Sequence, residues 1–345
     1  MAVVRLRQLD ALRGLAAASV VLYHFTVGYP LRFDWLGAPP ALSVPWGGFA
    51  VRVFFVISGF VILMTLERSA GLGAFMRARF ARLYPAYAAC LLLTFGLIAA
   101  TGFNPRSVSG EDALASLTMA PTLIGFGHVE AAYWTLTREI CFYALAGCAF
   151  FGLGARHFDR FVVAWLLFSV AANLSVAGRN FYAPQTPIDV LSIVLNVQFS
   201  YLFALGLFAC RLYRGQGTPL VILGIGLAFV ASAVSEWLVL QRLDLTAPAK
   251  TLLYAALVFA CAKGMLRPLN NRVCLGLGAL SYALYLVHET IGFFVIRQLQ
   301  QAGVSASLSI LAALLVVGLL AFAVRALVEV PAQRVLAPSR RPQLA

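Results

Sequence analysis

Hydrophobic positions in this chain form long runs separated by short polar breaks, as is typical of helices that cross a lipid bilayer. A helix needs about 20 mainly apolar residues to span the hydrocarbon core. Measured against that length, the 345-residue sequence predicts an all-α polytopic membrane protein with about ten transmembrane helices. The expected spans are 10–29, 48–66, 84–102, 133–153, 161–178, 190–211, 218–239, 250–266, 275–297 and 307–328.

One further apolar stretch, residues 114–128, is too short for a span and contains Pro121 and Gly125. It is expected to be a re-entrant or interfacial piece. Residues 1–336 are expected to form one membrane domain, followed by a short cytoplasmic tail at 337–345.

The composition supports lipid as the outer solvent of the fold. Hydrophobic residues make up 61% of the chain and charged residues 11%, whereas soluble domains carry roughly 25% charged residues. The net charge of +13 would suit a nucleic-acid partner, but the basic residues fall mainly in alternate loops. With the N-terminus inside, the inner segments hold 18 of the 26 lysines and arginines. The positive-inside rule then places both termini in the cytoplasm and explains the charge without nucleic acid.

The first candidate site is the stretch RQLDALRGLAAASVVLYHFTVG, residues 7–28. Arg13 and His24 are 11 residues apart, which is about 16 Å along a helix and about three turns. Both side chains therefore point to nearly the same face, and Asp10 is one turn from Arg13, within reach of an ion pair. Ionisable residues at membrane depth suggest function, and a neutral imidazole is a common general base. His24 could instead be a hydrogen-bonding residue in helix packing.

The second candidate is FMRARFARLYPAY, residues 75–87, which carries Arg77, Arg79 and Arg82 among aromatic residues. As a helix it would lie in the membrane interface with its apolar side in lipid. Guanidinium groups bind phosphates well. An anchor for anionic lipid head groups is an equally good interpretation of this pattern.

The third candidate is YWTLTREICFYAL, residues 133–145, in which Glu139 lies one or two turns inside the fourth span. Tyr143 is one turn further along the same face, and Trp134 flanks the site. A carboxylate at this depth needs a partner, and an interhelical ion pair is an alternative to a catalytic role. The candidate partners are His24, Arg138 and Arg52.

The fourth candidate is LSYALYLVHET, residues 280–290, near the middle of the ninth span. His288 and Glu289 are adjacent and would point about 100° apart on a helix, so both cannot serve one small site. Tyr282 and Tyr285 are about one turn apart and make one face of this helix aromatic. The pattern favours a packing role for His288, and His24 is the stronger candidate for a functional role.

Several common catalytic motifs are missing from the sequence. It contains no P-loop, no G-x-S-x-G elbow, no H-E-x-x-H and no dinucleotide fingerprint. None of the six cysteines form a C-x-x-C pair, so no metal site and no permanently bound cofactor are expected. A transporter or flippase of a saccharide or lipid intermediate remains an alternative, although no inverted repeat is visible.

Five segments in order resemble the acyltransferase 3 family of bacterial membrane O-acyltransferases. They are RLRQLDALRGLAAASVVLYHF, FFVISGFVI, RARFARLYPAY, YWTLTREICFY and LSYALYLVH, and they extend from the first span to the ninth. The family's Arg-x10-His motif corresponds to Arg13 and His24, and its Arg-x-Arg motif to Arg77 and Arg79.

The resemblance implies a multi-pass enzyme of the bacterial inner (cytoplasmic) membrane that transfers an acyl group, commonly acetyl, from cytoplasmic acyl-CoA. The acceptor would be a saccharide hydroxyl, on lipopolysaccharide, exopolysaccharide, a lipid-linked glycan or a glycosylated small molecule. Arg13, Arg77, Arg79 and Arg82 would then bind the donor. His24 would act as base or covalent acyl carrier, and Glu139 would orient its imidazole or receive the sugar. Asp10, Trp134, Tyr143 and His288 would support these two catalytic residues.

Overall fold

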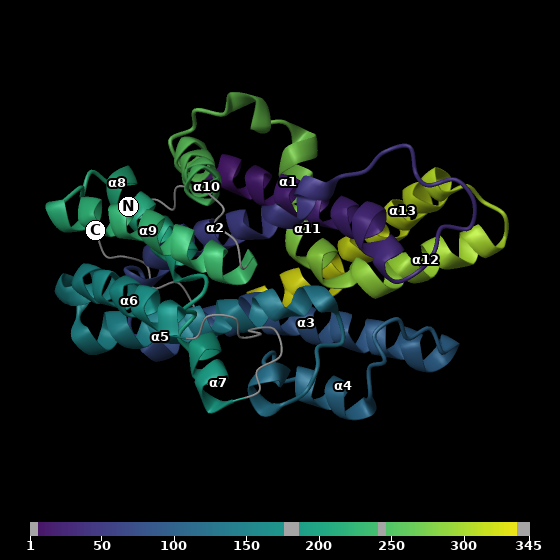
Figure 1. Cartoon of the computed structure of the whole chain (residues 1–345), viewed down its shortest axis with the longest axis horizontal. Helices are drawn as coiled ribbons and strands as arrows, with labels where there is room; N and C mark the ends of the chain where they lie inside the picture. The colour runs from purple at the N-terminus through teal and green to yellow at the C-terminus, as the bar shows by residue number, and fades with distance from the viewer. Residues whose placement is uncertain (1–5, 176–185, 241–245, 337–345) are drawn as a thin grey trace.

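The structure is a computed structural model that describes residues 6–175, 186–240 and 246–336, and all regular elements in these ranges are helical (Figure 1). This confirms the all-α fold for the described residues; the expected tail, 337–345, lies outside them. Two π-helical segments, His24–Gly28 and Arg325–Glu329, continue α1 and α13. The α-helices are α1 (Arg7–Tyr23), α2 (Ala50–Leu66), α3 (Leu72–Thr101), α4 (Gly110–Ser116), α5 (Trp134–Leu153), α6 (Ala155–Ser175), α7 (Pro187–Val194), α8 (Ser200–Tyr213), α9 (Pro219–Leu240), α10 (Ala247–Ala262), α11 (Arg272–Val287), α12 (Glu289–Gln301), α13 (Ala306–Val324) and α14 (Val330–Leu336).

Six helical stretches within the described residues are long and apolar enough to cross a membrane, and the bent pair α11 and α12 could form a seventh. The chain is therefore a multi-pass membrane protein. The predicted count of about ten spans is not confirmed, since the apolar helices α8 and α10 are shorter. The six stretches are Arg7–Leu31, Pro45–Leu66, Leu72–Thr101, Ala131–Leu153, Pro219–Trp237 and Ala306–Leu336.

The structure joins two predicted segments into α3 and agrees with the prediction that residues 114–128 form no span. The predicted interfacial piece at 75–87 and the predicted span at 84–102 belong to one 30-residue helix, α3. The arginine cluster therefore lies on the first turns of a helix that continues into the apolar region. Residues 114–128 contribute only the end of α4 and a 3-10 turn, Pro121–Ile124, so they do not form a span.

The expected span 275–297 is broken at His288. α11 ends one residue before this histidine, α12 begins one residue after it, and the two helices meet at a bend of 76°. The buried carboxylate of Glu130 caps the start of α12. It accepts hydrogen bonds from the backbone N–H and the hydroxyl of Thr290, at 3.0 and 2.9 Å. A carboxylate is a favourable cap because the first N–H groups of a helix have no partner inside the helix.

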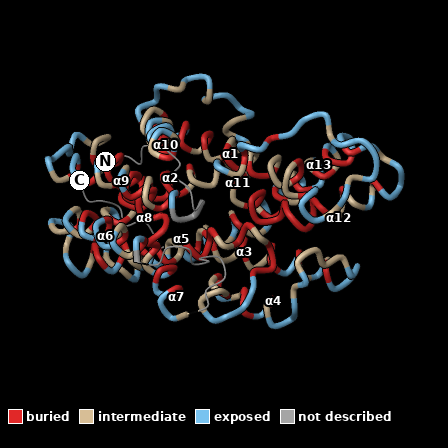
Figure 2. The backbone as a smooth tube through the Cα atoms, viewed as in Figure 1, coloured by how far each residue is buried: buried red, intermediate tan, exposed pale blue. Residues whose placement is uncertain are grey.

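Two glycine pairs allow the central helices to approach closely. α1 packs against α11, where Gly14 faces Gly278, and α2 packs against α8, where Gly59 faces Gly206. A Cβ at any of these four positions would lie under 3.0 Å from backbone of the neighbouring helix. Small residues at crossings are the usual means of bringing membrane helices together. Buried segments accordingly run through the middle of the bundle, and exposed ones lie at its periphery (Figure 2).

The bundle has two chemically different ends. We call the end that contains the starts of α1 and α3 the arginine end. At the opposite end, the loop end, the segments 29–49 and 102–131 touch near Phe33 and Phe103. There Phe33 stacks on Phe103 with ring centroids 5.5 Å apart, and Arg32 donates a hydrogen bond to the carbonyl of Pro105.

Candidate active site

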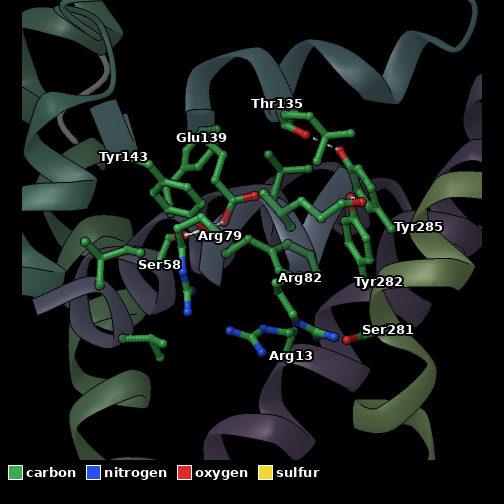
Figure 3. Close-up of a pocket in the computed structure, with 17 residues that line it drawn as sticks. Arg13, Ser58, Arg79, Arg82, Thr135, Glu139, Tyr143, Ser281, Tyr282 and Tyr285 are labelled. Carbon is green, nitrogen blue, oxygen red and sulfur yellow. Dashed lines mark hydrogen bonds between the residues drawn. The ribbon is translucent and has the colours of Figure 1, made fainter. Parts of the chain in front are cut away.

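A cavity of about 230 Å³ lies between α1, α2, α3, α5 and α11 (Figure 3). Its polar lining contains five residues that the sequence analysis proposed as site residues. They come from three helices and meet although they are up to 130 positions apart in the chain. These residues are Arg13, Arg79, Arg82, Glu139 and Tyr143.

Glu139 is held in the cavity by two hydroxyl groups. It accepts a hydrogen bond from Ser58 Oγ at 2.6 Å and another from the hydroxyl of Tyr143, one turn further along α5. The expected partners His24, Arg138 and Arg52 are not its hydrogen-bond partners; Arg52, for example, pairs with Glu236 at 2.6 Å. Glu139 is therefore a polar centre inside the cavity.

Three guanidinium groups gather on one side of the cavity, away from Thr135 and Tyr285 (Figure 3). Arg79 lies over the rings of Phe75 and Tyr143, at 6.0 and 5.9 Å from their centroids. Such contacts with aromatic faces orient a guanidinium group without neutralising it. The cavity therefore combines a cationic side with a single carboxylate.

Arg82 and Arg13 are each paired with a carboxylate. Arg82 forms an ion pair with Glu329 of the second π segment and lies 5.7 Å from the ring centroid of Tyr282. Arg13 is 4.0 Å from Asp10, as expected from their spacing. Arg77 is exposed on α3 and does not line the cavity.

His24 is the first residue of the π segment that follows α1, and its side chain is half-buried. It does not line the cavity. Phe54 and Tyr285 line the cavity, and Val20, one turn before His24, packs in one cluster with them. We call these three residues the apolar layer. Arg13 and His24, which were predicted to point to nearly the same face, therefore do not line the same cavity.

His24 instead contacts His288. The distance between His24 Nδ1 and His288 Nε2 is 3.0 Å, and the ring centroids are 4.8 Å apart. The bend between α11 and α12 brings the fully buried His288 to this position. Glu289 points elsewhere, toward the backbone N–H of Ala132 and toward Arg32, as its adjacency to His288 predicts.

Trp134 lies outside the cavity lining. Its ring packs against Phe55 and Phe199, with centroids 6.1 and 5.4 Å apart. This is a packing contact between α5, α2 and the start of α8. The structure therefore places Trp134 behind the cavity.

Sequence reasoning missed three polar residues of this region. Ser58 lies in the quoted segment FFVISGFVI, where a small hydroxyl does not stand out in an apolar helix. Neither Glu130 nor Glu329 was proposed as a candidate. The two glutamates could have been found from the sequence, since a carboxylate at the edge of an apolar run needs a partner.

Residues 6–327 match the family described as the acyltransferase domain. The chain belongs to this acyltransferase family. The resemblance seen in the sequence is thereby confirmed over nearly the whole chain. Together with the helical bundle, the family makes the protein a membrane enzyme that transfers acyl groups.

Named relatives agree with this assignment. The acyltransferase is 27% identical over 323 residues to the acyltransferase MdmB of Streptomyces mycarofaciens, across 86% of this chain and 80% of the relative. It is 30% identical over 144 residues to an O-acetyl transferase of Shigella phage Sf6, across 38% of this chain and 42% of the relative. No solved structure shows a significant match to the chain.

Proposed function

We propose that this acyltransferase moves an acyl group, acetyl in the simplest case, from acyl-CoA to a hydroxyl group of a saccharide. The observation that supports the donor is the cavity in which Arg13, Arg79 and Arg82 meet. Acyl-CoA carries several phosphate charges, and guanidinium groups bind phosphate with directed, charge-assisted hydrogen bonds. The oxygen acceptor and the acetyl group are suggested by the relative named O-acetyl transferase.

The size of the cavity indicates which part of the donor it would hold. Its volume of about 230 Å³ is below the roughly 300–1,000 Å³ of pockets that enclose drug-sized ligands. The slender pantetheine arm and a small acyl group suit this space, whereas the nucleotide of coenzyme A would remain at the mouth. The arginines would then contact phosphates near the mouth, and the thioester would point toward Glu139.

The orientation of the enzyme follows from where acyl-CoA is found. We place the arginine end in the cytoplasm and both termini inside, in the cytoplasmic membrane of a bacterium. The bias of lysine and arginine, 18 of 26 in the inner segments of the predicted topology, supports this orientation. The loop end would then face outward and offer the acceptor a route of its own.

His24 is proposed to accept the proton of the acceptor hydroxyl, or to carry the acyl group on its ring. For either role, the thioester must pass the apolar layer of Val20, Phe54 and Tyr285. Tyr285 is fixed, since its hydroxyl bonds to Thr135 and to the carbonyl of Ala132. Phe54 has no such bond and is half-buried, so rotation of its ring is the simplest way to open the passage.

Glycan mass spectrometry tests the transfer reaction. Cell polysaccharides and glycosylated small molecules are compared in strains that lack the protein, carry it, or carry His24→Ala. We expect an added acyl mass that needs both the protein and His24. A covalent acyl change that persists at full level with a folded His24→Ala protein would refute the role of His24.

Binding of acetyl-CoA to the purified protein tests the donor site separately. Arg79→Met is expected to weaken binding about tenfold or more, because a hydrogen bond to a charged group contributes roughly 1.5–3 kcal/mol. Arg272→Met is the matched control, since Arg272 is exposed at the start of α11 and does not line the cavity. Equal weakening by both substitutions would refute the cavity as the donor site.

A further inference from the structure

The hydrogen-bond partners of His24 and His288 define which of their ring nitrogens carry protons. His288 Nδ1 is 2.8 Å from the carbonyl oxygen of Tyr285. A carbonyl oxygen can only accept, so Nδ1 of His288 must carry the proton. A neutral imidazole has one N–H, and Nε2 of His288 is therefore an acceptor.

The partners of His24 define its tautomer in the same way. Its Nδ1 lies 3.0 Å from the carbonyl oxygen of Val20 and 3.0 Å from Nε2 of His288. Both neighbours are acceptors, so Nδ1 of His24 carries a proton that is shared between them. Nε2 of His24 then holds the free lone pair, and it has no hydrogen-bond partner among the residues that the structure describes.

We propose that His288 is a positioning residue for His24. It accepts the Nδ1–H of His24, keeps Nε2 as the basic nitrogen, and stabilises the imidazolium that forms when Nε2 takes a proton. The inference rests on the proposed function, in which His24 is the proton acceptor. In catalytic triads the group that accepts the Nδ1–H of the histidine is usually a carboxylate. In this protein the neutral imidazole of His288 would accept it.

The surroundings of the pair favour a neutral partner. His288 has no exposed surface, and an unpaired carboxylate at this depth would be costly. A neutral imidazole needs no counter-charge in the resting enzyme. When His24 becomes an imidazolium, its Nδ1–H forms a charge-assisted hydrogen bond to His288, which is about twice as strong as a neutral one.

The break between α11 and α12 holds His288 in place. His288 lies between the two helices, and the 76° bend directs the residues after it away from the axis of α11. Glu130 stabilises the bend through Thr290, and Glu130 is itself bonded to Thr94 on α3 at 3.0 Å. The position of the ring is therefore set by contacts from α3 and from the segment before α5.

Two substitutions separate positioning from packing. His288→Gln places a carboxamide oxygen where it can still accept from His24, and His288→Met fills similar space without a comparable acceptor. We expect kcat to fall roughly 10- to 100-fold in His288→Met with KM for acyl-CoA within about twofold of wild type. His288→Gln is expected to recover most of this loss. Equal kcat in both variants, with matching melting temperatures, would overturn the inference.

A spectroscopic measurement addresses the hydrogen bond directly. In the full-length protein with ¹⁵N-labelled histidine, a scalar coupling across the N–H···N bond should connect His24 Nδ1 and His288 Nε2. The coupling should disappear in His288→Gln, which assigns it. A wild-type spectrum in which His24 is protonated on Nε2 would overturn the inference.

The outcomes distinguish the inference from the proposed function. If a folded His24→Ala protein remains fully active, the proposed function fails, whatever His288 does. If His24→Ala is inactive while His288→Met retains full kcat, only the positioning role of His288 fails.

Discussion

Gly14 and Gly278 face each other where α1 crosses α11, so closely that neither position has room for a methyl group. A Cβ on Gly278 would lie under 3.0 Å from the carbonyl oxygen of Asp10. This crossing sets the separation between α1, which carries Arg13 and continues into the π segment at His24, and α11, which ends just before His288. The glycine pair therefore couples helix packing to the geometry of the candidate active site.

Gly278→Ala is expected to destabilise the protein and lower its activity. The added methyl group must push α1 away from α11, and overpacking of this kind costs about 1–3 kcal/mol. The contact between His24 and His288 should lengthen as a result. Thermal unfolding in detergent and acyl transfer by the same preparation measure the two effects.

Gly276→Ala is the matched control on the same helix. A Cβ at Gly276 has no neighbour within 4 Å, and alanine is favoured over glycine in a helix by about 0.8–1 kcal/mol. This variant should melt at the wild-type temperature or above it. If Gly276→Ala and Gly278→Ala behave alike, the crossing does not limit either property.

Phe54→Trp is expected to block the route from the arginine cavity to His24. The larger ring cannot turn aside as readily as phenylalanine between Val51 and Tyr285, so the thioester would stop short of the imidazole. A displacement of about 1 Å at a reacting centre can cost roughly 100-fold in rate. We therefore expect kcat to fall at least about tenfold, while acetyl-CoA binding is retained.

Phe322→Trp serves as the control because Phe322 is exposed on α13, far in sequence from the cavity residues. It should leave both kcat and binding unchanged. A full kcat in Phe54→Trp would mean that the acyl group reaches His24 by another path, such as the loop end.

The sequence predicted much of the cavity because its chemistry is local. A charged residue in or beside an apolar run is conspicuous, and four of those considered line one cavity in the structure: Arg13, Arg79, Arg82 and Glu139. The helical spacing of Glu139 and Tyr143 also placed them correctly on one face.

The break at His288 was not predictable in this way. Neither proline nor glycine occupies positions 287–289, and the residue that caps α12, Glu130, is 160 positions away from its partner Thr290. The rotation of about 100° per residue in a helix therefore predicted correctly that His288 and Glu289 point in different directions. It gave no reason to expect contact between His288 and His24. Tertiary contacts decide both the bend and the histidine pair.

Arg211→Met is expected to destabilise the arginine end. Arg211 of α8 donates to Asp159 at 3.0 Å and to Glu67 at 2.9 Å, and so connects the ends of α6 and α2. Breaking a buried ion pair costs roughly 3–5 kcal/mol. Since these side chains are partly exposed, we expect about 2–3 kcal/mol, measured as a lower melting temperature.

Arg211→Lys is the conservative variant for this prediction, and Arg267→Met is its control. A lysine presents one compact charge and cannot reproduce the planar fork, so Arg211→Lys should recover only part of the lost stability. Arg267 is exposed and forms no ion pair within the described residues, and Arg267→Met should be neutral. Wild-type melting of Arg211→Met would contradict a structural role for the network.

His128 is expected to make the loop end sensitive to acid. It lies between the 3-10 turn Pro121–Ile124 and the span that begins at Ala131, is 7% exposed, and neither ring nitrogen has a hydrogen-bond partner among the described residues. Burial, together with the nearby charge of Arg106, lowers the pKa of His128 from 6.5 to about 4. The folded protein therefore holds this ring neutral where an unfolded chain would protonate it.

The sign of the effect follows from proton binding. Between about pH 6.5 and pH 4 the unfolded state binds more protons, so the free energy of unfolding falls as the pH is lowered through this window. The loss attributable to His128 approaches at most about 3 kcal/mol near pH 4, because one pKa unit corresponds to about 1.4 kcal/mol. Melting temperatures from pH 7 to pH 4.5 should decline less steeply in His128→Gln than in wild type. His157→Gln, at a half-buried histidine bonded to Arg156, should keep the wild-type slope; parallel slopes in wild type and His128→Gln would show that a different group causes the acid sensitivity.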